Sequence, residues 1–389
     1  MESRFKIAIV GGSLSTYGGG APRSMAQQAT VLTEQGHHVE LFVGFSRKYP
    51  LTQEQFSCRE TPVNASVLWG PSVLGLFPRA LFKLWKRAGE FDFIHLNGAW
   101  NLTTVLGALI ARSRKTPYII TMRGHFGEYH FRRMPSLKKL IFRIFEKTNI
   151  RHACAMHATA QWEVETSAMA LQYARQVIVI PNPVDLTDFR NPPLRQEARQ
   201  KLGLSDKDFH IVHLGRLAKQ KNLPFLIDVF AQANLGSDSF LTFIGPPEPD
   251  LKCELLNQVD ALQIKDRVRF IDFAKGKERS NWLAAADLFA LPSFDENFCI
   301  VAAESVACGT QTLLSPHVGV TEFLPAQLTH VAELDPKKWI SALQQFKADA
   351  LPQRIPDPAD LSGFSTAKVY AEWMSFYHSQ QRANSYEDQ

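Results

Sequence analysis

Cysteine is scarce in this 389-residue sequence: there are five, and none of them forms a Cys-x-x-Cys pair with another. A disulfide framework or a zinc ribbon is therefore not expected, and a reducing compartment fits this usage best. The chain also lacks an uninterrupted apolar run of about 18 residues, so we predict no membrane-spanning helix. Because the short charged start runs directly into the strand-like segment Ile7–Val10, we expect no signal peptide.

Acidic residues are depleted in only one half of the chain. Residues 1–180 contain 22 Lys and Arg against 11 Asp and Glu, whereas residues 181–389 contain 21 against 27. A half with such an excess of basic residues is expected to face an anionic partner, such as a membrane, a nucleic acid or a charged substrate. No recognition motif accompanies the basic charge, so we do not predict a nucleic-acid partner.

Short β-rich runs alternate with helical stretches throughout the sequence. This alternation predicts an α/β fold with parallel sheets that are covered by helices on both faces. The expected strands are Lys6–Val10, Val39–Val43, Phe93–Leu96, Tyr118–Met122, Ala155–Ala158 and Gln176–Ile180 in the first half, and Phe209–Leu214, Phe240–Ile244, Val268–Phe270, Leu288–Ala290 and Thr312–Leu314 in the second.

A proline-rich segment, Pro181–Pro183, separates the two series of strands and indicates an interdomain connection. We therefore predict two doubly wound, Rossmann-like domains that face a central cleft, with residues 1–183 in the first and 184–366 in the second. A helix at about residues 367–380 is expected to pack back on the first domain, and the polar tail from Ser379 is expected to fray.

Three loops carry residues suited to binding a phosphorylated ligand. Gly18, Gly19 and Gly20 precede a predicted helix, where backbone can approach an anion closely. This segment matches neither the dinucleotide fingerprint nor the P-loop, so a plain surface loop stays an alternative. Arg216 and Lys221 follow the strand Phe209–Leu214, and two cations at fixed positions suit a pyrophosphate, although a solvated basic loop has the same composition.

The third loop contains two glutamates. Glu296 follows the strand Leu288–Ala290, and Glu304 lies in the helix predicted at Val301–Ala307. Such carboxylates can hydrogen-bond sugar hydroxyls, form the acid–base pair of a hydrolase, or simply cap a helix or lie at the surface. The backbone amides of residues 297–300 open this helix and can donate hydrogen bonds to an anion or a hydroxyl.

Taken together and in this order, these features resemble family 4 of the retaining nucleotide-sugar glycosyltransferases, which have the GT-B fold, over nearly the whole chain. The most specific match is the E-x7-E motif from Glu296 to Glu304. The resemblance also rests on Ala307-Cys308-Gly309-Thr310, Gly215-Arg216…Lys221, Gly18-Gly19 and Pro181-Asn182-Pro183-Val184-Asp185. Two further segments, Met122-Arg123-Gly124 and His157-Ala158-Thr159-Ala160, resemble a branch of the family found in bacterial surface-polysaccharide clusters.

The resemblance implies a role for each candidate residue. Arg216 and Lys221 would bind the donor diphosphate, and Glu304 the ribose hydroxyls. Either Arg123 or His125 would lie nearest the reacting sugar. The remaining contacts would come from Glu296 and the backbone of Asn297, Phe298, Cys299 and Ile300, which hold the donor sugar, and from Gly18, Gly19 and Gly20 against the phosphates. Cys299 replaces a glycine of the family, which predicts a narrower donor pocket.

The activity implied is transfer of a sugar from a nucleoside-diphosphate sugar to a polysaccharide or lipid-linked glycan, with no metal or other cofactor. A sugar-nucleotide 2-epimerase of the same fold and a catalytically silent sugar-binding protein are the alternatives. The location expected is the cytoplasm, with peripheral binding to the inner face of the cytoplasmic membrane. The stretches Arg79–Arg87 and Arg132–Lys147 mix apolar and basic residues and would provide the anionic-membrane contact.

Overall fold

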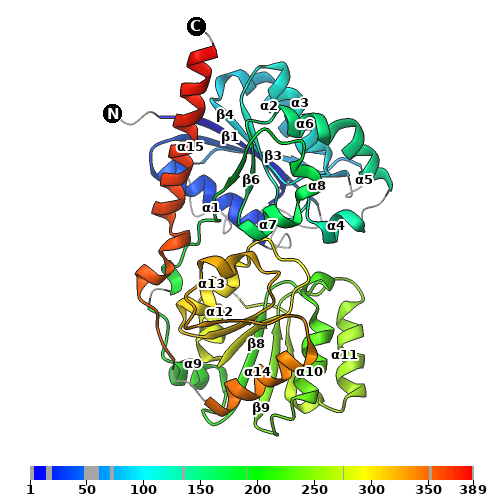
Figure 1. Cartoon of the computed structure of the whole chain (residues 1–389), viewed down its shortest axis with the longest axis vertical. Helices are drawn as coiled ribbons and strands as arrows, with labels where there is room; N and C mark the ends of the chain where they lie inside the picture. Colours follow the sequence, from blue (N-terminus) through cyan, green and yellow to red (C-terminus); the bar gives the residue numbers. More distant parts are fainter. Residues whose placement is uncertain are drawn as a thin grey trace. The chain divides into compact units, whose positions relative to one another are not determined.

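The chain folds into two α/β units (Figure 1). The computed structural model describes residues 4–14, 20–47, 61–70, 74–133, 136–189, 191–274, 276–349 and 353–387. Unit 1 consists of Met1–Val184 together with Phe364–Gln389, and unit 2 of Asp185–Gly363. The first boundary lies one residue after the predicted one, and the second lies three residues before it.

Unit 1 is built on a seven-stranded sheet of order β3-β2-β1-β4-β5-β6-β7, in which every neighbouring pair is parallel. The sequence did not predict β3, a half-exposed edge strand with only a weak apolar pattern. The strands are β1 (Lys6–Ser13), β2 (His38–Phe45), β3 (Val63–Val67), β4 (Phe93–Asn97), β5 (Tyr118–Thr121), β6 (Ala155–Ala158) and β7 (Val177–Val179).

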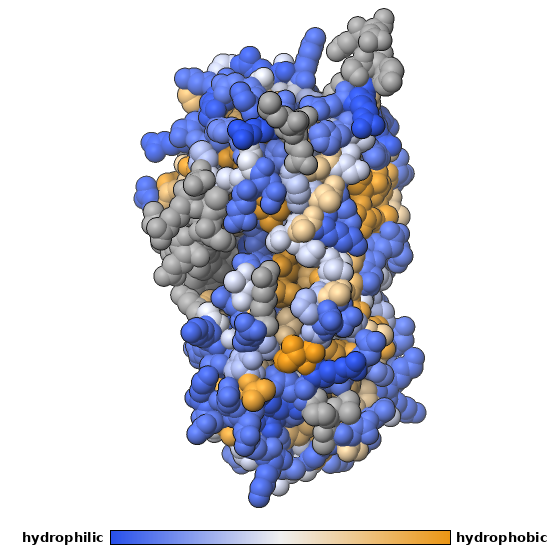
Figure 2. Space-filling view, turned by 90° about the vertical axis from the view of Figure 1, so that its left-hand side faces the viewer, coloured by the Kyte–Doolittle hydropathy of each residue, from blue (hydrophilic) through white to orange (hydrophobic). Residues whose placement is uncertain are grey.

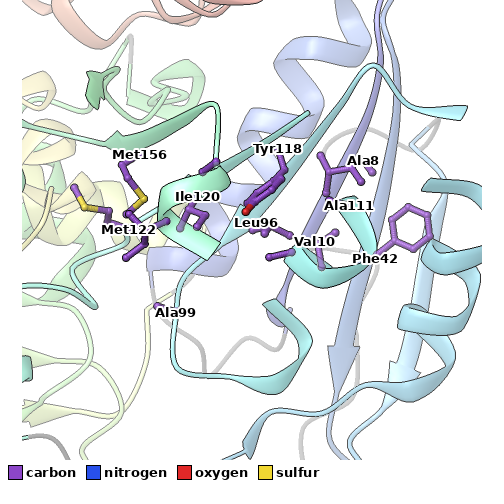
Figure 3. Packing of buried hydrophobic residues seen from close by; sticks show 14 of the residues in the cluster. Ala8, Val10, Phe42, Leu96, Ala99, Ala111, Tyr118, Ile120, Met122 and Met156 are labelled. Carbon is purple, nitrogen blue, oxygen red and sulfur yellow. The ribbon is translucent and has the colours of Figure 1, made fainter. Parts of the chain in front are cut away.

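Helices cover both faces of this sheet, because successive side chains of a strand point to opposite sides. In β1, Ile7 and Ile9 join the core under α1 (Gly20–Glu34) and α15 (Thr366–Glu387). Ala8 and Val10 join the other core, shown in Figure 3. The helices α2 (Pro78–Arg87), α3 (Leu102–Ser113) and α6 (Lys147–His152) contribute to this second core. The other helices of unit 1 are α4 (Glu128–Arg132), α5 (Ser136–Ile141), α7 (Gln161–Thr166) and α8 (Ala168–Leu171), and a π-helical turn covers Phe142–Glu146.

The C-terminal helix α15 is part of unit 1 (Figure 1). Trp373 packs between the rings of His95 and His157, with both centroid distances 4.7 Å, and the Tyr377 hydroxyl hydrogen-bonds His95 Nε2 at 2.7 Å. The predicted fraying from Ser379 is wrong, since α15 continues to Glu387. These aromatic contacts hold the helix against the sheet. The polar residues after Ser379 therefore extend a helix that is already formed.

Unit 2 has a six-stranded parallel sheet of order β10-β9-β8-β11-β12-β13. The three-residue edge strand β13 was not predicted. The strands are β8 (Phe209–Leu214), β9 (Ser239–Ile244), β10 (Val268–Ile271), β11 (Leu288–Leu291), β12 (Gln311–Leu314) and β13 (Thr329–Val331), and the helices are α9 (Arg195–Leu202), α10 (Leu223–Gln232), α11 (Leu251–Ala261), α12 (Lys277–Ala285), α13 (Ile300–Ala307) and α14 (Pro336–Asp349). One core cluster joins α10, α11 and α14 to this sheet.

Hydrophilic side chains cover most of the face shown in Figure 2, and hydrophobic ones emerge between them in small groups. Among the residues described, no helix is both long and apolar enough to cross a bilayer.

Acidification should lower the free energy of unfolding of unit 1 through the protonation of His95 in the unfolded chain. Burial lowers the pKa of His95 to about 3, so the folded chain keeps this imidazole neutral where the unfolded chain takes up a proton, below about 6.5. Since the unfolded state then binds more protons, the contribution of His95 to the free energy of unfolding falls by about 1.4 kcal/mol per pH unit on acidification. Urea unfolding of wild type and His95→Gln should show their stability difference shrinking between pH 6 and pH 4. A difference independent of pH would contradict this.

Candidate active site

The order of strands in unit 2 reverses between β8 and β11. From β8 the chain moves to β9 and β10 on one side, and then returns to β11 on the other. In open parallel sheets, ligands bind at such a point, beyond the carboxyl ends of the strands. The loops that carry Arg216, Lys221 and Glu296 leave β8 and β11 at this edge.

Hydrogen bonds hold these loops together. The Ser293 hydroxyl and the Phe294 amide both donate to the carbonyl of Gln220, each at 2.9 Å. The Glu296 amide donates to the carbonyl of His317, also at 2.9 Å, in the loop after β12. The loop after β11 therefore has a fixed position relative to the loops on both sides.

Lys221 and Glu296 form an ion pair at this edge. Their side chains are 15% and 12% exposed, respectively. Burial lowers the pKa of Lys221 to about 8, and the nearby Arg216 cation acts in the same direction. The negative charges of Cys299, when ionised, and of Asp295 act against that shift in the pKa of Lys221 by favouring the ammonium. The Lys221 ammonium is thus partly desolvated, and its interaction with an anion is stronger there than in water.

Arg216 pairs with a residue that the sequence did not single out. Its Nη1 donates to Glu248 Oε1 at 3.0 Å, and Glu248 Oε2 accepts the Lys219 amide at 3.1 Å. Glu248 lies in the loop after β9 and so connects a third strand end to the Arg216 loop. The Arg216 side chain is 43% exposed, so it is accessible to a ligand.

The helix α13 starts directly after the Glu296 loop. Cys299 precedes it with φ 75°, in the left-handed region that favours glycine. Phe298 is buried, and its ring packs against that of Phe323. Burial raises the pKa of the Cys299 thiol, against the opposing effect of the Lys221 ammonium. Asn297 is half-buried and Ile300 is buried.

Glu304 is fully buried in α13 and forms an ion pair with Arg279 of α12. A carboxylate without a counter-charge at this depth would cost several kcal/mol. Arg279 therefore supplies the opposite charge beside Glu304 inside the unit. Sequence reasoning missed Arg279, because 25 residues separate the partners and no motif connects them.

The remaining candidates belong to unit 1. Gly18 and Gly19 lie outside the described residues, and Gly20 begins α1. Arg123 and His125 follow β5. Arg123 is buried, and its Nε and Nη2 donate to Asn97 Oδ1 at 3.1 and 2.9 Å. His125 Nδ1 accepts the amide of Ala99 at 2.9 Å. The structure thus brings together Arg216, Lys221 and Glu296 within unit 2, while Arg123 and His125 form a separate group within unit 1.

The residues described at these loops do not form a metal-binding cluster. The triplet Asp206-Lys207-Asp208 lies in the turn before β8, at the opposite edge of the sheet. Within the described part of the chain, no group of three or more His, Cys, Asp or Glu could hold a metal ion.

Comparison with known proteins relates both units to glycosyltransferases. A family model described as "Glycosyl transferase 4-like domain" matches residues 19–183, and one described as "Glycosyl transferases group 1" matches residues 195–356. The chain is 27% identical over 316 residues to D-inositol 3-phosphate glycosyltransferase 1 of Catenulispora acidiphila, covering 75% of this chain and 70% of that protein. It is 27% identical over 234 residues to alpha-monoglucosyldiacylglycerol synthase of Streptococcus pneumoniae, covering 58% of this chain and 52% of that protein.

The fold has a close counterpart among solved structures. Anabaena HepE in complex with UDP-glucose matches with a TM-score of 0.69 at 19% identity, over 99% of this chain and 100% of that one. At this identity the likeness shows the fold. Together with the two parallel α/β units, it confirms the predicted GT-B architecture.

The backbone at Cys299 predicts an unusual order of stability for two variants. A left-handed backbone costs an L-residue about 1–2 kcal/mol, and glycine avoids this cost. Cys299→Gly should therefore be more stable than Cys299→Ala by about 1 kcal/mol in urea unfolding. At Ala303, inside α13, glycine should instead lower stability by about 1 kcal/mol relative to alanine. The same order at both positions would show that Cys299 is not held in the left-handed region.

Proposed function

This chain belongs to family 4 of the glycosyltransferases, and we propose that it moves a sugar from a nucleoside-diphosphate sugar to a polysaccharide or lipid-linked glycan, with retention of configuration. The observation that carries the proposal is the pairing of Lys221 with Glu296, beside Arg216, at the strand-order reversal of unit 2. The HepE complex with UDP-glucose is a precedent for such a donor in this fold.

Charge separation in the reaction explains why these residues suit it. As the bond between the sugar and the diphosphate breaks, negative charge grows on the leaving phosphate and positive charge on the sugar ring. Lys221 and Arg216 would stabilise the leaving diphosphate, in the way that preorganised donors stabilise a developing anion. An approaching diphosphate also favours the ammonium form of Lys221, whose pKa burial holds at about 8.

The two glutamates would act on different parts of the donor. Glu304 would accept hydrogen bonds from the ribose hydroxyls, with Arg279 as its ion-pair partner. Glu296 would accept hydrogen bonds from the sugar, together with the backbone amides of residues 297–300 at the start of α13. We assign no covalent nucleophile, and propose that the acceptor attacks the same face of the sugar that the diphosphate leaves.

The proposed reaction needs no metal ion, because Lys221 and Arg216 would supply the positive charge at the phosphates. Unit 1 would bind the acceptor, with Arg123 and His125 on the loop after β5. The surface-polysaccharide branch of the family is part of this proposal, and rests on the segments Met122–Gly124 and His157–Ala160.

Loss of Lys221 tests the proposal. A thermal-shift panel of UDP, GDP and ADP first identifies the base, and transfer is then assayed with the matching sugars. Lys221→Ala should reduce turnover by about two orders of magnitude, as loss of one transition-state donor does. Lys219→Ala, which replaces an exposed lysine in the same turn, is the matched control and should turn over like wild type.

Excess EDTA should leave turnover intact, because no metal ion takes part in the proposed reaction. Equal turnover of both variants, or a complete loss with EDTA that Mg²⁺ restores, would refute these roles.

We also propose that unit 1 binds an anionic membrane surface through α2. Ala80, Leu81 and Leu84 of this helix face the core. Phe82 and Trp85 are 55% and 47% exposed and stack on each other at 6.1 Å. Exposed aromatic rings flanked by cations suit the interface between lipid headgroups and acyl chains.

Cations lie directly on these two rings. Lys86 Nζ is 4.6 Å from the ring centre of Phe82, and the Arg114 guanidinium is 5.0 Å from that of Trp85. The second stretch predicted from the sequence is less regular. It exposes Leu140 and Ile144 but buries Phe142, and it includes Met134 and Pro135, which lie outside the described residues. We therefore assign the main membrane contact to α2.

Vesicle sedimentation tests this contact. Wild type should bind anionic vesicles at low salt and neutral ones much less, since each basic residue near an anionic leaflet contributes about 1 kcal/mol. Lys83→Gln with Lys86→Gln should weaken binding, as should Phe82→Ser with Trp85→Ser. The matched control, Lys201→Gln with Lys207→Gln, makes the same charge change on exposed residues of unit 2 and should have little effect. Equal loss in both lysine pairs would point to net charge alone.

A further inference from the structure

Unit 1 contains a buried carboxylate to which neither the sequence nor the proposed reaction assigns a role. Glu163, in the first turn of α7, is 1% exposed. Its Oε1 accepts the amide of Gly124 at 2.5 Å, and its Oε2 accepts the amide and hydroxyl of Thr159 at 2.7 and 3.1 Å. This carboxylate therefore joins the start of α7 to the loop after β5, defined here as residues 122–127.

The loop that Glu163 holds has an unfavourable backbone. Arg123 and Gly124 have φ values of 54° and 74°, so two consecutive residues are left-handed and one of them is not glycine. Such conformations persist only where surrounding contacts impose them, and they cluster at functional sites. The Glu163–Gly124 hydrogen bond is one of these contacts.

Glu163 also supplies charge that the loop needs. The Arg123 guanidinium is buried and donates to the side-chain oxygens of Asn97 and Asn182, which are neutral. Burial lowers the pKa of Arg123 to about 10, and the Glu163 carboxylate opposes this shift. Without that carboxylate the loop would enclose a cation bound by amide oxygens alone.

The same loop fixes the tautomer of His125. Its Nδ1 accepts the Ala99 amide, so the proton of the neutral ring is on Nε2. The Trp100 indole donates to the His125 carbonyl at 2.8 Å. Gly98 has φ 84°, and a Cβ there would lie 2.7 Å from the His125 ring. The ring is therefore enclosed by the loop after β4 as well as by its own.

We propose that Glu163 is a positioning residue for transfer: it fixes residues 122–127, the loop that carries Arg123 and His125, in the conformation that transfer requires. This inference rests on the function proposed above. Glutamine cannot replace Glu163, since the carboxylate accepts three hydrogen bonds through two oxygens, whereas an amide has one oxygen and an NH₂ that would face an N–H donor.

The test combines kinetics with histidine NMR. Glu163→Gln should lower kcat at least tenfold, while nucleoside-diphosphate affinity and donor KM stay within twofold, because the proposed donor residues are in unit 2. Glu165→Gln, an exposed glutamate on the same helix, is the matched control and should behave like wild type. In ¹⁵N-histidine spectra, the signals that disappear in His125→Gln should show an Nε2-protonated tautomer in wild type and lose that signature in Glu163→Gln.

An unchanged kcat or an unchanged His125 signature in Glu163→Gln would overturn the proposal. If that variant does not fold, Glu163→Asp takes its place, because the shorter carboxylate retreats from Gly124 while keeping its charge, and the same losses are expected. Failure of both variants to fold would assign Glu163 to stability alone. If wild type neither binds nucleoside diphosphates nor transfers any sugar, the proposed function fails, whereas the NMR comparison still decides the positioning role.

Discussion

Parallel pairing of neighbouring strands is the constraint on which both groups of candidate residues depend. In unit 2, the pairing of β8 with β11 places the loops after these strands side by side. In unit 1, the pairing of β4 with β5 does the same for the loops that carry Trp100 and His125. The carboxyl ends of parallel strands share one edge, so residues far apart in sequence meet there without any helix having to bend.

The charges at these edges are arranged in opposite pairs. Arg216 lies beside Glu248, Lys221 beside Glu296, and Arg279 beside Glu304. Burying Lys221, Glu296 or Glu304 without a counter-charge would cost several kcal/mol, and the ion-pair partner of each offsets that cost, whereas the Arg216–Glu248 pair is more exposed. A diphosphate that binds Lys221 and Arg216 must compete with two carboxylates. That competition would disfavour weakly charged anions more than a nucleoside diphosphate, and so contributes to selectivity.

The sequence predicted the parallel α/β fold and the GT-B architecture, because apolar periodicity and the E-x7-E motif are local signals. It missed β3 and β13, which are short edge strands with little apolar surface to bury. It also missed Glu248, Arg279 and Glu163, which meet their partners across 32, 25 and 39 residues of sequence. No local pattern shows such contacts, since the pairing of strands creates them.

Arg123 and His125 illustrate how structure separates residues that sequence resemblance leaves equivalent. The guanidinium of Arg123 is used within unit 1, where Asn97 and Asn182 accept its hydrogen bonds and Glu163 supplies the opposite charge. His125 Nδ1 accepts a backbone amide, and this fixes the proton of the neutral ring on Nε2. A ring nitrogen that already carries a proton can donate a hydrogen bond to an oxygen without any change of protonation state. In the function proposed above, His125 would contact the substrate and Arg123 would support the loop that carries it.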